Sequence, residues 1–187
     1  MRNRQPRHTV ATTLATPMGA VRIAATHRGV CRMNFVAVRQ ADSAARRTSA
    51  PPRRGLSAGG GRMAPADSAS ARQAQEHLQR AARQLKEYFA GRRKTFDLAL
   101  DLQGTAHQRR VWRALLEIPF GQTLSYGQVA RQLGTPGSAR AVGHACASNP
   151  VWLVVPCHRV IASDGGLHGY GGGLWRKQRL LEWESGK

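Results

Sequence analysis

A stretch of thirty residues in the first half of the chain, residues 41–70, limits what this sequence can fold into, because it shows no hydrophobic period. It reads ADSAARRTSAPPRRGLSAGGGRMAPADSAS and consists mostly of alanine, serine, glycine, proline and arginine. Such a composition offers few side chains to a core, so the region near 40–70 is predicted to be a mobile loop. The 187 residues, 41% of them hydrophobic, therefore form either one domain or two small ones around this loop.

The segments on either side of this loop carry the signals of strands and of one long helix. Residues 9–36 alternate β-branched or apolar residues with glycine turns at Gly19 and Gly29, which predicts short strands. Residues 71–90 place apolar side chains three and four positions apart, which predicts a helix. Residues 94–104 alternate again, and we expect a further short strand there.

After Gly104, glycine and proline divide the sequence into short helices. The first carries Val111 on its apolar face and ends at Pro119 and Gly121. Ser125, with Gln128 three residues later, is a capping-box arrangement that begins the second helix. The regular punctuation indicates several short helices.

The next helix is expected to have Thr135 as its N-cap and Pro136 as its first residue, and to run to Asn149. Two short helices joined by a tight glycine and proline turn predict a helix-turn-helix. Residues 152–156, WLVVP, are expected to form a brief buried strand, and residues 174–184 a final amphipathic helix.

Together these elements predict an α+β protein. Residues 1–103 would form a small N-terminal α/β domain with antiparallel strands and the basic loop. Residues 104–187 would form a mainly helical C-terminal domain with a winged or helix-turn-helix-like DNA-binding motif.

The charge balance indicates a polyanionic partner. The chain has 29 Lys and Arg against 10 Asp and Glu, a net charge of +19, and a pI near 11.7. Such an excess favours nucleic acid or an acidic membrane surface, with compositional drift toward arginine as the alternative. For the loop at 40–70, contact with DNA and plain solvation both stay open. Residues 104–187 carry ten basic and four acidic residues, so the predicted helical domain is basic as well.

The three cysteines, Cys31, Cys146 and Cys157, form neither a disulfide framework nor a zinc-binding spacing. We expect reduced thiols in a cytosolic protein. No apolar segment follows the basic N-terminus as a secretory signal requires, and nothing approaches the roughly 18 apolar residues of a membrane span. The prediction is a soluble, cytoplasmic protein that does not bind membranes.

The segment PCHRV, which begins at Pro156, follows directly after an apolar run. A cysteine is nucleophilic when its surroundings favour the thiolate, starting from an ordinary pKa of ~8.5. His158 and Arg159 follow Cys157 at once, and a glycine-rich loop supplies backbone N–H groups nearby. Cys157 is therefore a candidate nucleophile, and a buried, inert cysteine is the alternative on these residues alone.

The string VVPCHRVIASDGGLHGYGGG, preceded by SYGQVARQLGTPGSARAVGHACASNP and followed by KQRLLEWE, resembles the O6-alkylguanine-DNA alkyltransferases. The match extends back through GTAHQRRVWRALLEIPFGQTLSYGQ and covers residues 104–184 almost without a gap. The earlier half matches more loosely, through TPMGAVRIAATHRGV and LKEYFAGRRKTFDLALDLQGT. The resemblance implies DNA repair by a single, irreversible transfer of an alkyl group from guanine O6, and also from O4-alkylthymine, to a cysteine.

The resemblance also implies catalytic roles. Cys157 stands at the nucleophile position, His158 where the family has the residue that accepts the thiol proton through a water, and Glu184 where it has the carboxylate that orients the histidine. Asn149 matches the asparagine that ties the turn to the active-site strand. Tyr126 matches the tyrosine that crowds the target phosphate and assists protonation of the leaving group. From the residues alone, Glu184 is equally a solvated carboxylate and Asn149 a helix stop.

A base inside a duplex is out of reach, so the resemblance implies that the target nucleotide is flipped out. Arg140 matches the arginine that fills the vacated stack, and small residues around it keep the helix slim for the minor groove, with close helix packing as the alternative. The predicted DNA-binding residues are Arg140, Tyr126, Ala139, Ala141, Gly143 and Arg159. The predicted base pocket consists of Val155, Pro156, Val160, Tyr170 and Gly171.

Four residues depart from the family pattern and are expected to alter helix packing or pocket size: His107, Cys146, Trp152 and His168. Some family members carry a structural zinc near the N-terminus, but this chain lacks the required cysteines and histidines there, so we expect no metal and no other cofactor. The expected partner is double-stranded DNA containing O6-alkylguanine, bound by a monomer, with clustering on DNA left open.

Three other functions account for parts of the sequence. A non-catalytic relative that binds alkylated DNA would lack the cysteine of PCHR, which this chain has. A transcriptional regulator would use the same helix-turn-helix but would need a further ligand-binding or DNA-binding domain. A cysteine hydrolase would need an oxyanion-hole motif, which the sequence does not show.

Overall fold

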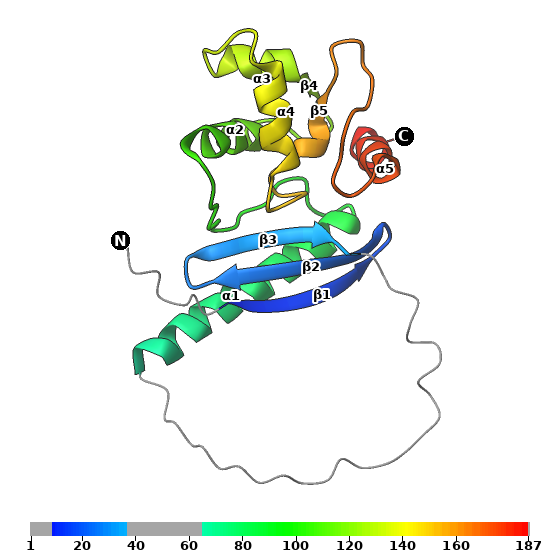
Figure 1. Ribbon diagram of the computed structural model, residues 1–187. Coiled ribbons are helices and arrows are strands. Elements are labelled where there is room, and N and C mark those ends of the chain that lie inside the picture. The colour runs from blue at the N-terminus through cyan, green and yellow to red at the C-terminus, as the bar shows by residue number, and fades with distance from the viewer. Residues whose placement is uncertain (1–8, 37–64, 187) are drawn as a thin grey trace, which may run out of the picture.

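The computed structural model describes residues 9–36 and 65–186. A three-stranded sheet lies between the long helix α1 and a group of shorter helices that stands on the side of strand β3 (Figure 1). Buried side chains from the sheet, from α1 and from the shorter helices form one hydrophobic core. The predicted α+β class is confirmed, and residues 37–64, most of the predicted basic loop, lie outside the described residues.

The sheet consists of β1 (Val10–Thr16), β2 (Gly19–Thr26) and β3 (Gly29–Phe35), all antiparallel and in chain order. This confirms the strands expected at 9–36. Gly29 has a φ of +142°, and a Cβ there would lie 2.3 Å from the carbonyl oxygen of Ala99. Only glycine therefore allows the later chain to approach β3 so closely.

Residues 94–104 do not form the expected strand. Within this segment only Leu100 pairs with the sheet, through a single parallel bridge to Val30. The chain is held there by two hydrogen bonds, from Val30 N to Ala99 O at 2.8 Å and from Asp101 N to Val30 O at 2.9 Å. The alternating pattern reflects half-buried side chains along an extended connection.

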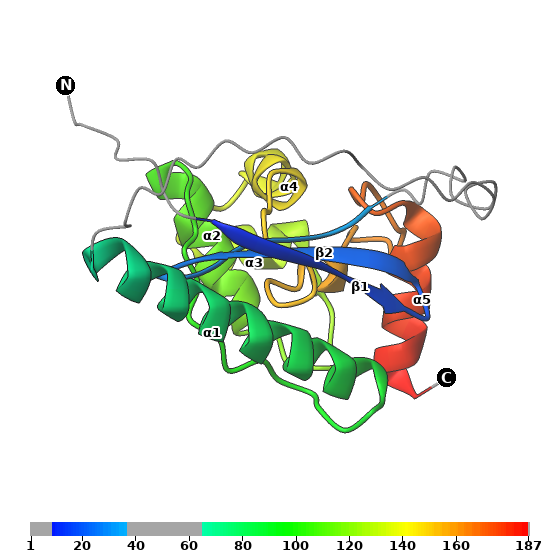
Figure 2. The ribbon, with the colours of Figure 1, turned by 90° about the horizontal axis from the view of Figure 1, so that it is seen from below.

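Helix α1 (Pro65–Phe89) crosses one face of the sheet (Figure 2). It begins six residues before the predicted start at 71, inside the segment expected to be a loop. Its apolar stripe packs on β1 and β2 and includes the fully buried Leu85 and Tyr88. The helix stops where Gly91 takes a φ of +73°, as the position of that glycine predicts.

Three helices follow: α2 (Ala106–Leu116), α3 (Tyr126–Gln132) and α4 (Ala139–Ala147). Ser125 and Gln128 form the predicted capping box of α3. Helix α4 begins three residues later than expected, because Pro136 and Gly137 form a turn and the N-cap is Ser138 instead of Thr135. The α3 and α4 pair is the predicted helix-turn-helix.

Residues 152–156 do not form the expected strand either. They make a turn in which Leu153 has a φ of +70°, followed by the short 3₁₀ helix η1 (Cys157–Arg159). The turn is anchored on β3 by a hydrogen bond from Trp152 N to Met33 O at 2.7 Å. The apolar run is buried because it crosses the core.

The last elements close the fold. Strand β5 (Val160–Ile161) pairs in parallel with β4 (Leu124–Ser125), and helix α5 (Leu174–Ser185) packs against η1. Between β5 and α5 runs the glycine-rich segment 165–173, which we call the pocket loop. Across 9–36 and 65–186, none of the helices has both the length and the apolar character to cross a membrane.

Candidate active site

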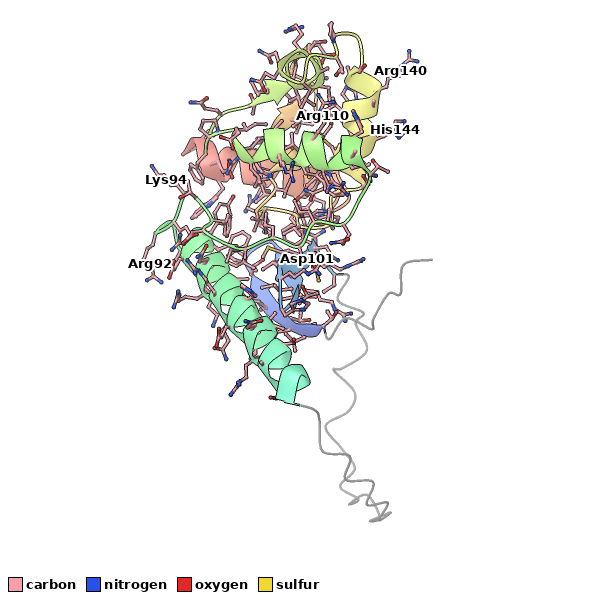
Figure 3. The ribbon with its side chains drawn as sticks, turned by 90° about the vertical axis from the view of Figure 1, so that its left-hand side faces the viewer. Arg92, Lys94, Asp101, Arg110, Arg140 and His144 are labelled. Carbon is pink, nitrogen blue, oxygen red and sulfur yellow. The ribbon has the colours of Figure 1, made fainter. Side chains whose placement is uncertain are left out.

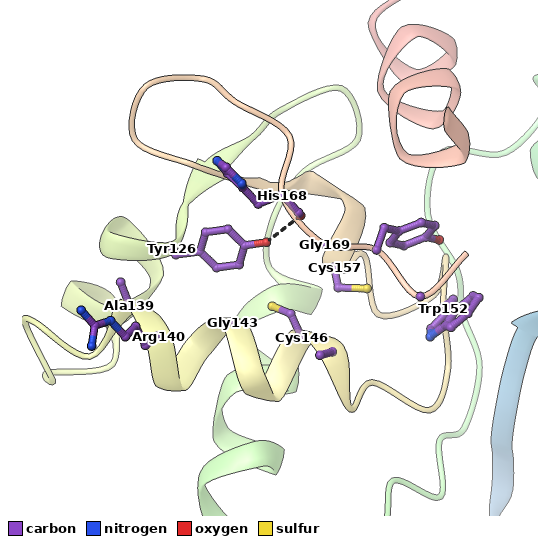
Figure 4. Close-up of a pocket in the computed structure, with 12 residues that line it drawn as sticks. Tyr126, Ala139, Arg140, Gly143, Cys146, Trp152, Cys157, His168 and Gly169 are labelled. Atoms are coloured by element: carbon purple, nitrogen blue, oxygen red, sulfur yellow. Dashed lines mark hydrogen bonds between the residues drawn. The ribbon is translucent and has the colours of Figure 1, made fainter. Parts of the chain in front are cut away.

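Cys157, the first residue of η1, lies on a cavity of about 550 Å³ (Figure 4). The start of α3, one face of α4, the turn after α4 and the pocket loop surround this cavity. Its lining residues are Tyr126, Ala139, Arg140, Gly143, Cys146, Ala147, Trp152, Cys157, His168, Gly169, Tyr170 and Gly171. The structure thus brings a thiol to the bottom of a cavity that is large enough for a small ligand.

The thiol of Cys157 is held by Asn149, whose Nδ2 donates to Cys157 Sγ at 3.2 Å and to Val155 O at 2.8 Å. Asn149 Oδ1 accepts from Val151 N at 2.9 Å, so one side chain joins the end of α4 to the turn that carries the cysteine. Burial raises the pKa of Cys157 to about 11, although the Asn149 hydrogen bond and the nearby Lys177 oppose the rise. At rest the group is a neutral thiol, which differs from the expectation that its neighbours favour the thiolate.

His158 is fully buried behind the cysteine, and its Nε2 lies 3.0 Å from Glu184 Oε1. Burial lowers the pKa of His158, and the hydrogen bond to Glu184 only partly offsets this. The ring is therefore neutral at pH 7. Its other nitrogen, Nδ1, has no hydrogen-bond partner among the described residues, so the imidazole keeps one unoccupied position to accept a proton.

Glu184 is the centre of a buried polar cluster. Besides His158, its carboxylate accepts hydrogen bonds from Tyr88 Oη at 2.7 Å, from Arg159 Nε at 2.7 Å and Nη2 at 2.9 Å, and from Gly121 N at 3.2 Å. Burial alone would raise the pKa of Glu184, but the hydrogen bonds from His158 and Arg159 hold it well below its ordinary value. The carboxylate is thus ionised and fixed, and the solvated alternative is excluded.

Arg159 does not have the position that a DNA contact requires, and the prediction of DNA binding at this residue is wrong. Its side chain is buried, with Nη1 donating to Ile118 O at 2.6 Å and the rest of the guanidinium bound to Glu184. A buried charge without a partner is energetically unfavourable. The Arg159 guanidinium and the Glu184 carboxylate are therefore stable inside the protein only as a pair.

Tyr126 and Lys177 both hold the pocket loop at the carbonyl group of His168. Tyr126 Oη donates to His168 O at 3.3 Å (Figure 4), and Lys177 Nζ donates to the same carbonyl at 2.9 Å and to Val160 O at 2.7 Å. Burial lowers the pKa of Lys177, while Cys157 and Cys146 oppose this shift. Sequence reasoning missed Lys177, since a lysine in an amphipathic helix usually lies in solvent.

The sequence-predicted residues separate into three groups. Asn149 is hydrogen-bonded to Cys157, and the next residue in the chain, His158, is hydrogen-bonded to Glu184. Tyr88, which was expected only as part of an apolar helix stripe, also donates to Glu184, and we call these five residues the Cys157 cluster. Tyr126, Ala139, Arg140, Gly143, Tyr170 and Gly171 line the cavity, whereas Ala141, Val155, Pro156 and Val160 do not. Val155, Pro156 and Val160 are buried beside the cavity lining, and their place in the base pocket stays a prediction.

Several basic side chains are exposed on the helical part. Arg140 and His144 project from exposed positions of α4, and Arg110 of α2 lies on the same side of the molecule (Figure 3). Arg92 and Lys94 lie elsewhere, beside the end of α1. In 9–36 and 65–186, no three His, Cys, Asp or Glu side chains are grouped so that they could hold a metal ion.

Two family models match the chain and together span nearly all of it. Residues 9–102 match the 6-O-methylguanine DNA methyltransferase, ribonuclease-like domain. Residues 106–186 match the 6-O-methylguanine DNA methyltransferase, DNA binding domain. The boundary between the two matches falls where the extended connection ends and α2 begins.

Individual relatives agree with these models. A methylated-DNA–protein-cysteine methyltransferase of Mycolicibacterium paratuberculosis is 61% identical over 104 residues, which are 56% of this chain and 63% of that protein. The chain thus spans somewhat less than two thirds of this relative's length in the match. The crystal structure of Mycobacterium tuberculosis O6-methylguanine methyltransferase has a TM-score of 0.71 and 36% identity, covering 96% of this chain and 94% of its own. The Mycobacterium tuberculosis OGT solved in complex with DNA has a TM-score of 0.70 and 39% identity, and the match covers 93% of this chain and 91% of that one.

Proposed function

Because this chain belongs to the 6-O-methylguanine DNA methyltransferase family, we propose that it repairs DNA by moving an alkyl group from O6 of guanine to Cys157. The observation that carries the proposal is that Cys157 lines the cavity while the next residue, the neutral His158, is hydrogen-bonded to the ionised Glu184. A thiol beside a neutral base that is oriented by a fixed carboxylate is the arrangement of an activated nucleophile.

In the proposed step, Cys157 Sγ attacks the alkyl carbon while the bond from that carbon to guanine O6 breaks. The sulfur lone pair forms the new S–C bond, and the electrons of the broken C–O bond stay on guanine. The thiol proton leaves toward His158 Nδ1, the guanine anion takes one proton from water, and His158 then returns its proton to the solvent, so that atoms and charge balance. A thioether has no route back to the thiol, and each molecule therefore acts once.

The proposed substrate is double-stranded DNA with the O6-alkylguanine rotated out of the stack. Arg140, exposed at the cavity rim, would occupy the vacated space, and Tyr126 would crowd the phosphate of the extruded nucleotide. Ala139, Ala141 and Gly143 leave the backbone of α4 open to close approach by a groove. The protein would act as a monomer in the cytoplasm, where a reducing environment preserves the thiol.

The proposal is tested by incubating the protein with a duplex that contains one O6-methylguanine and then measuring its mass. The peptide with Cys157 should gain about one methylene, ~14 Da, because S-methylation replaces the thiol hydrogen by a methyl group. The gain should saturate at one group per molecule.

Two variants make this result decisive. Cys157→Ala should show no transfer, while Cys146→Ala, which removes the other thiol that lines the cavity, should keep it. Transfer that survives in Cys157→Ala, or that fails in the unaltered protein with a fully reduced thiol, contradicts the proposal.

The pH dependence of the transfer rate follows from the two shifted pKa values. His158 is neutral at any pH above its lowered pKa, and the Cys157 thiol stays protonated at any pH below its raised pKa. In the pH range between these two pKa values, neither group changes its protonation state. The rate of single-turnover transfer should therefore be constant between about pH 7 and about pH 9. With His158→Gln, the reaction would depend on the thiolate alone and the rate should rise about tenfold per pH unit.

The control for this measurement is His77→Gln, a histidine of α1 outside the cavity, which should keep the flat profile. Rates are measured with saturating O6-methylguanine duplex, and thermal melting confirms that each variant is folded. A rising profile in the unaltered protein would show that His158 does not accept the proton.

A further inference from the structure

Arg176, in the first turn of α5, connects two parts of the fold that are distant in sequence. Its Nε donates to Met18 O at 2.7 Å, in the turn between β1 and β2, and its Nη1 donates to Gly172 O at 2.7 Å, in the pocket loop. A single half-buried side chain thus ties the N-terminal sheet to the segment that walls the cavity. Guanidinium geometry suits this task, because its N–H groups point in fixed, divergent directions.

The same guanidinium lies between two aromatic rings. Its centre is 4.8 Å from the centroid of Phe35, at the end of β3, and 4.3 Å from that of Trp175. Both distances are within the range of cation–π attraction. The guanidinium is therefore fixed by two hydrogen bonds and two aromatic rings, whereas an arginine in solvent requires none of these contacts.

From Phe35 the contact continues to the cavity wall. The Phe35 and Trp152 ring centroids are 6.2 Å apart, and those of Trp152 and Tyr170 are 5.4 Å apart. Trp152 and Tyr170 both line the cavity that holds Cys157. Three packed rings, those of Phe35, Trp152 and Tyr170, thus connect the N-terminal sheet to the cavity wall.

The pocket loop depends on such contacts because six of its nine residues, 165–173, are glycine. A glycine-rich backbone loses much conformational freedom when it is held in one arrangement. The fit is tight: a Cβ on Gly172 would lie 3.1 Å from Phe35 Cδ2, and one on Gly171 would lie 2.5 Å from the Trp152 ring. Near its middle, at His168, the loop is held by Lys177 and Tyr126, and the Arg176 contact at Gly172 adds support toward its C-terminal end.

We propose that Arg176 is a positioning residue for base binding, which fixes the pocket loop against the N-terminal sheet in the arrangement that accepts the extruded guanine. The inference rests on the proposed function, because it takes this cavity as the guanine site. It assigns a role in that site to the N-terminal sheet, which otherwise contributes no residue to the cavity lining. Arg176 touches neither Cys157 nor its proton acceptor in any contact of the structure, so it should affect binding more than chemistry.

The test is single-turnover alkylation with free O6-benzylguanine and with free O6-methylguanine over a range of concentrations. Free bases avoid the contribution of DNA contacts, and they separate the half-saturating concentration from the limiting rate. Arg176→Ala should raise the half-saturating concentration about tenfold and leave the limiting rate within about twofold, since the Cys157 cluster is intact. Arg176→Lys keeps the charge near the rings but loses the two directed hydrogen bonds. Its half-saturating concentration should lie between those of the unaltered protein and Arg176→Ala.

The matched control is Arg179→Ala, an exposed arginine one turn later on α5, which should change neither quantity. Equal half-saturation in Arg176→Ala and the unaltered protein would overturn the inference, as would a loss confined to the limiting rate. If the unaltered protein forms no adduct at Cys157 with either base or with alkylated duplex, the proposed function itself fails. The two failures are thus distinguished.

Discussion

Glu184→Gln should destabilise the protein by about 3–5 kcal/mol, because the substitution leaves the buried Arg159 guanidinium without its counter-charge. The amide also presents an N–H group where Arg159, His158 and Tyr88 all donate. At least one of these donors must then lose its partner inside the protein. The free energy of unfolding, measured by urea denaturation at pH 7, checks the effect.

The matched control is Glu182→Gln, on the same helix. Glu182 is half-buried, and its partner Gln178 is exposed. This variant should lie within about 0.5 kcal/mol of the unaltered protein. If Glu184→Gln is no less stable than Glu182→Gln, the buried pair does not have the energetic role assigned to it.

The pH dependence of stability gives a second readout of the same cluster. The pKa of Glu184 is held below its ordinary value in the folded protein, so the carboxylate contributes stability that is fully present above the unfolded-state pKa. That contribution is lost as the pH falls from about 4.3 toward the folded pKa. The stability difference between the unaltered protein and Glu184→Gln should therefore shrink below about pH 4.3 and stay constant above about pH 6.

Arg140→Ala should slow the repair of O6-methylguanine in duplex DNA by about 10- to 100-fold, because unstacking a base costs a few kcal/mol and each ~1.4 kcal/mol of lost compensation is tenfold in rate. Reaction with free O6-benzylguanine needs no extrusion and should change by less than about twofold. The side chain is exposed and lies at the cavity rim, outside the Cys157 cluster, which is why the two substrates should respond differently.

Arg131→Ala serves as the control, since Arg131 is an exposed arginine of α3 that does not line the cavity. An arginine that only contacts phosphate should weaken binding of damaged and undamaged duplex alike and lower the salt slope by about one unit. Equal slowing of Arg140→Ala on free base and on duplex would assign Arg140 to pocket or fold support instead.

The locally encoded parts of the fold were predictable because their signals involve residues close together in sequence. The capping box of Ser125 and Gln128 spans three residues, and the stop at Gly91 depends on one positive φ. The strands predicted at 94–104 and 152–156 are absent from the structure because strand formation depends on residues far away in the sequence. A strand needs a partner strand, and the alternation or apolarity of a segment does not show whether one is available.

The sequence by itself determined that Cys157 is followed by a histidine in PCHRV, that a helix-turn-helix precedes it, and which family the chain belongs to. Only the tertiary structure decided that Arg159 points inward, that Tyr88 and Lys177 support the site, and that Arg176 joins the sheet to the pocket loop. The Tyr88–Glu184 and Arg176–Met18 hydrogen bonds join residues 96 and 158 positions apart. Such contacts, and the burial that raises the pKa of Cys157, arise when the chain closes into one core, because they depend on which distant surfaces exclude water together.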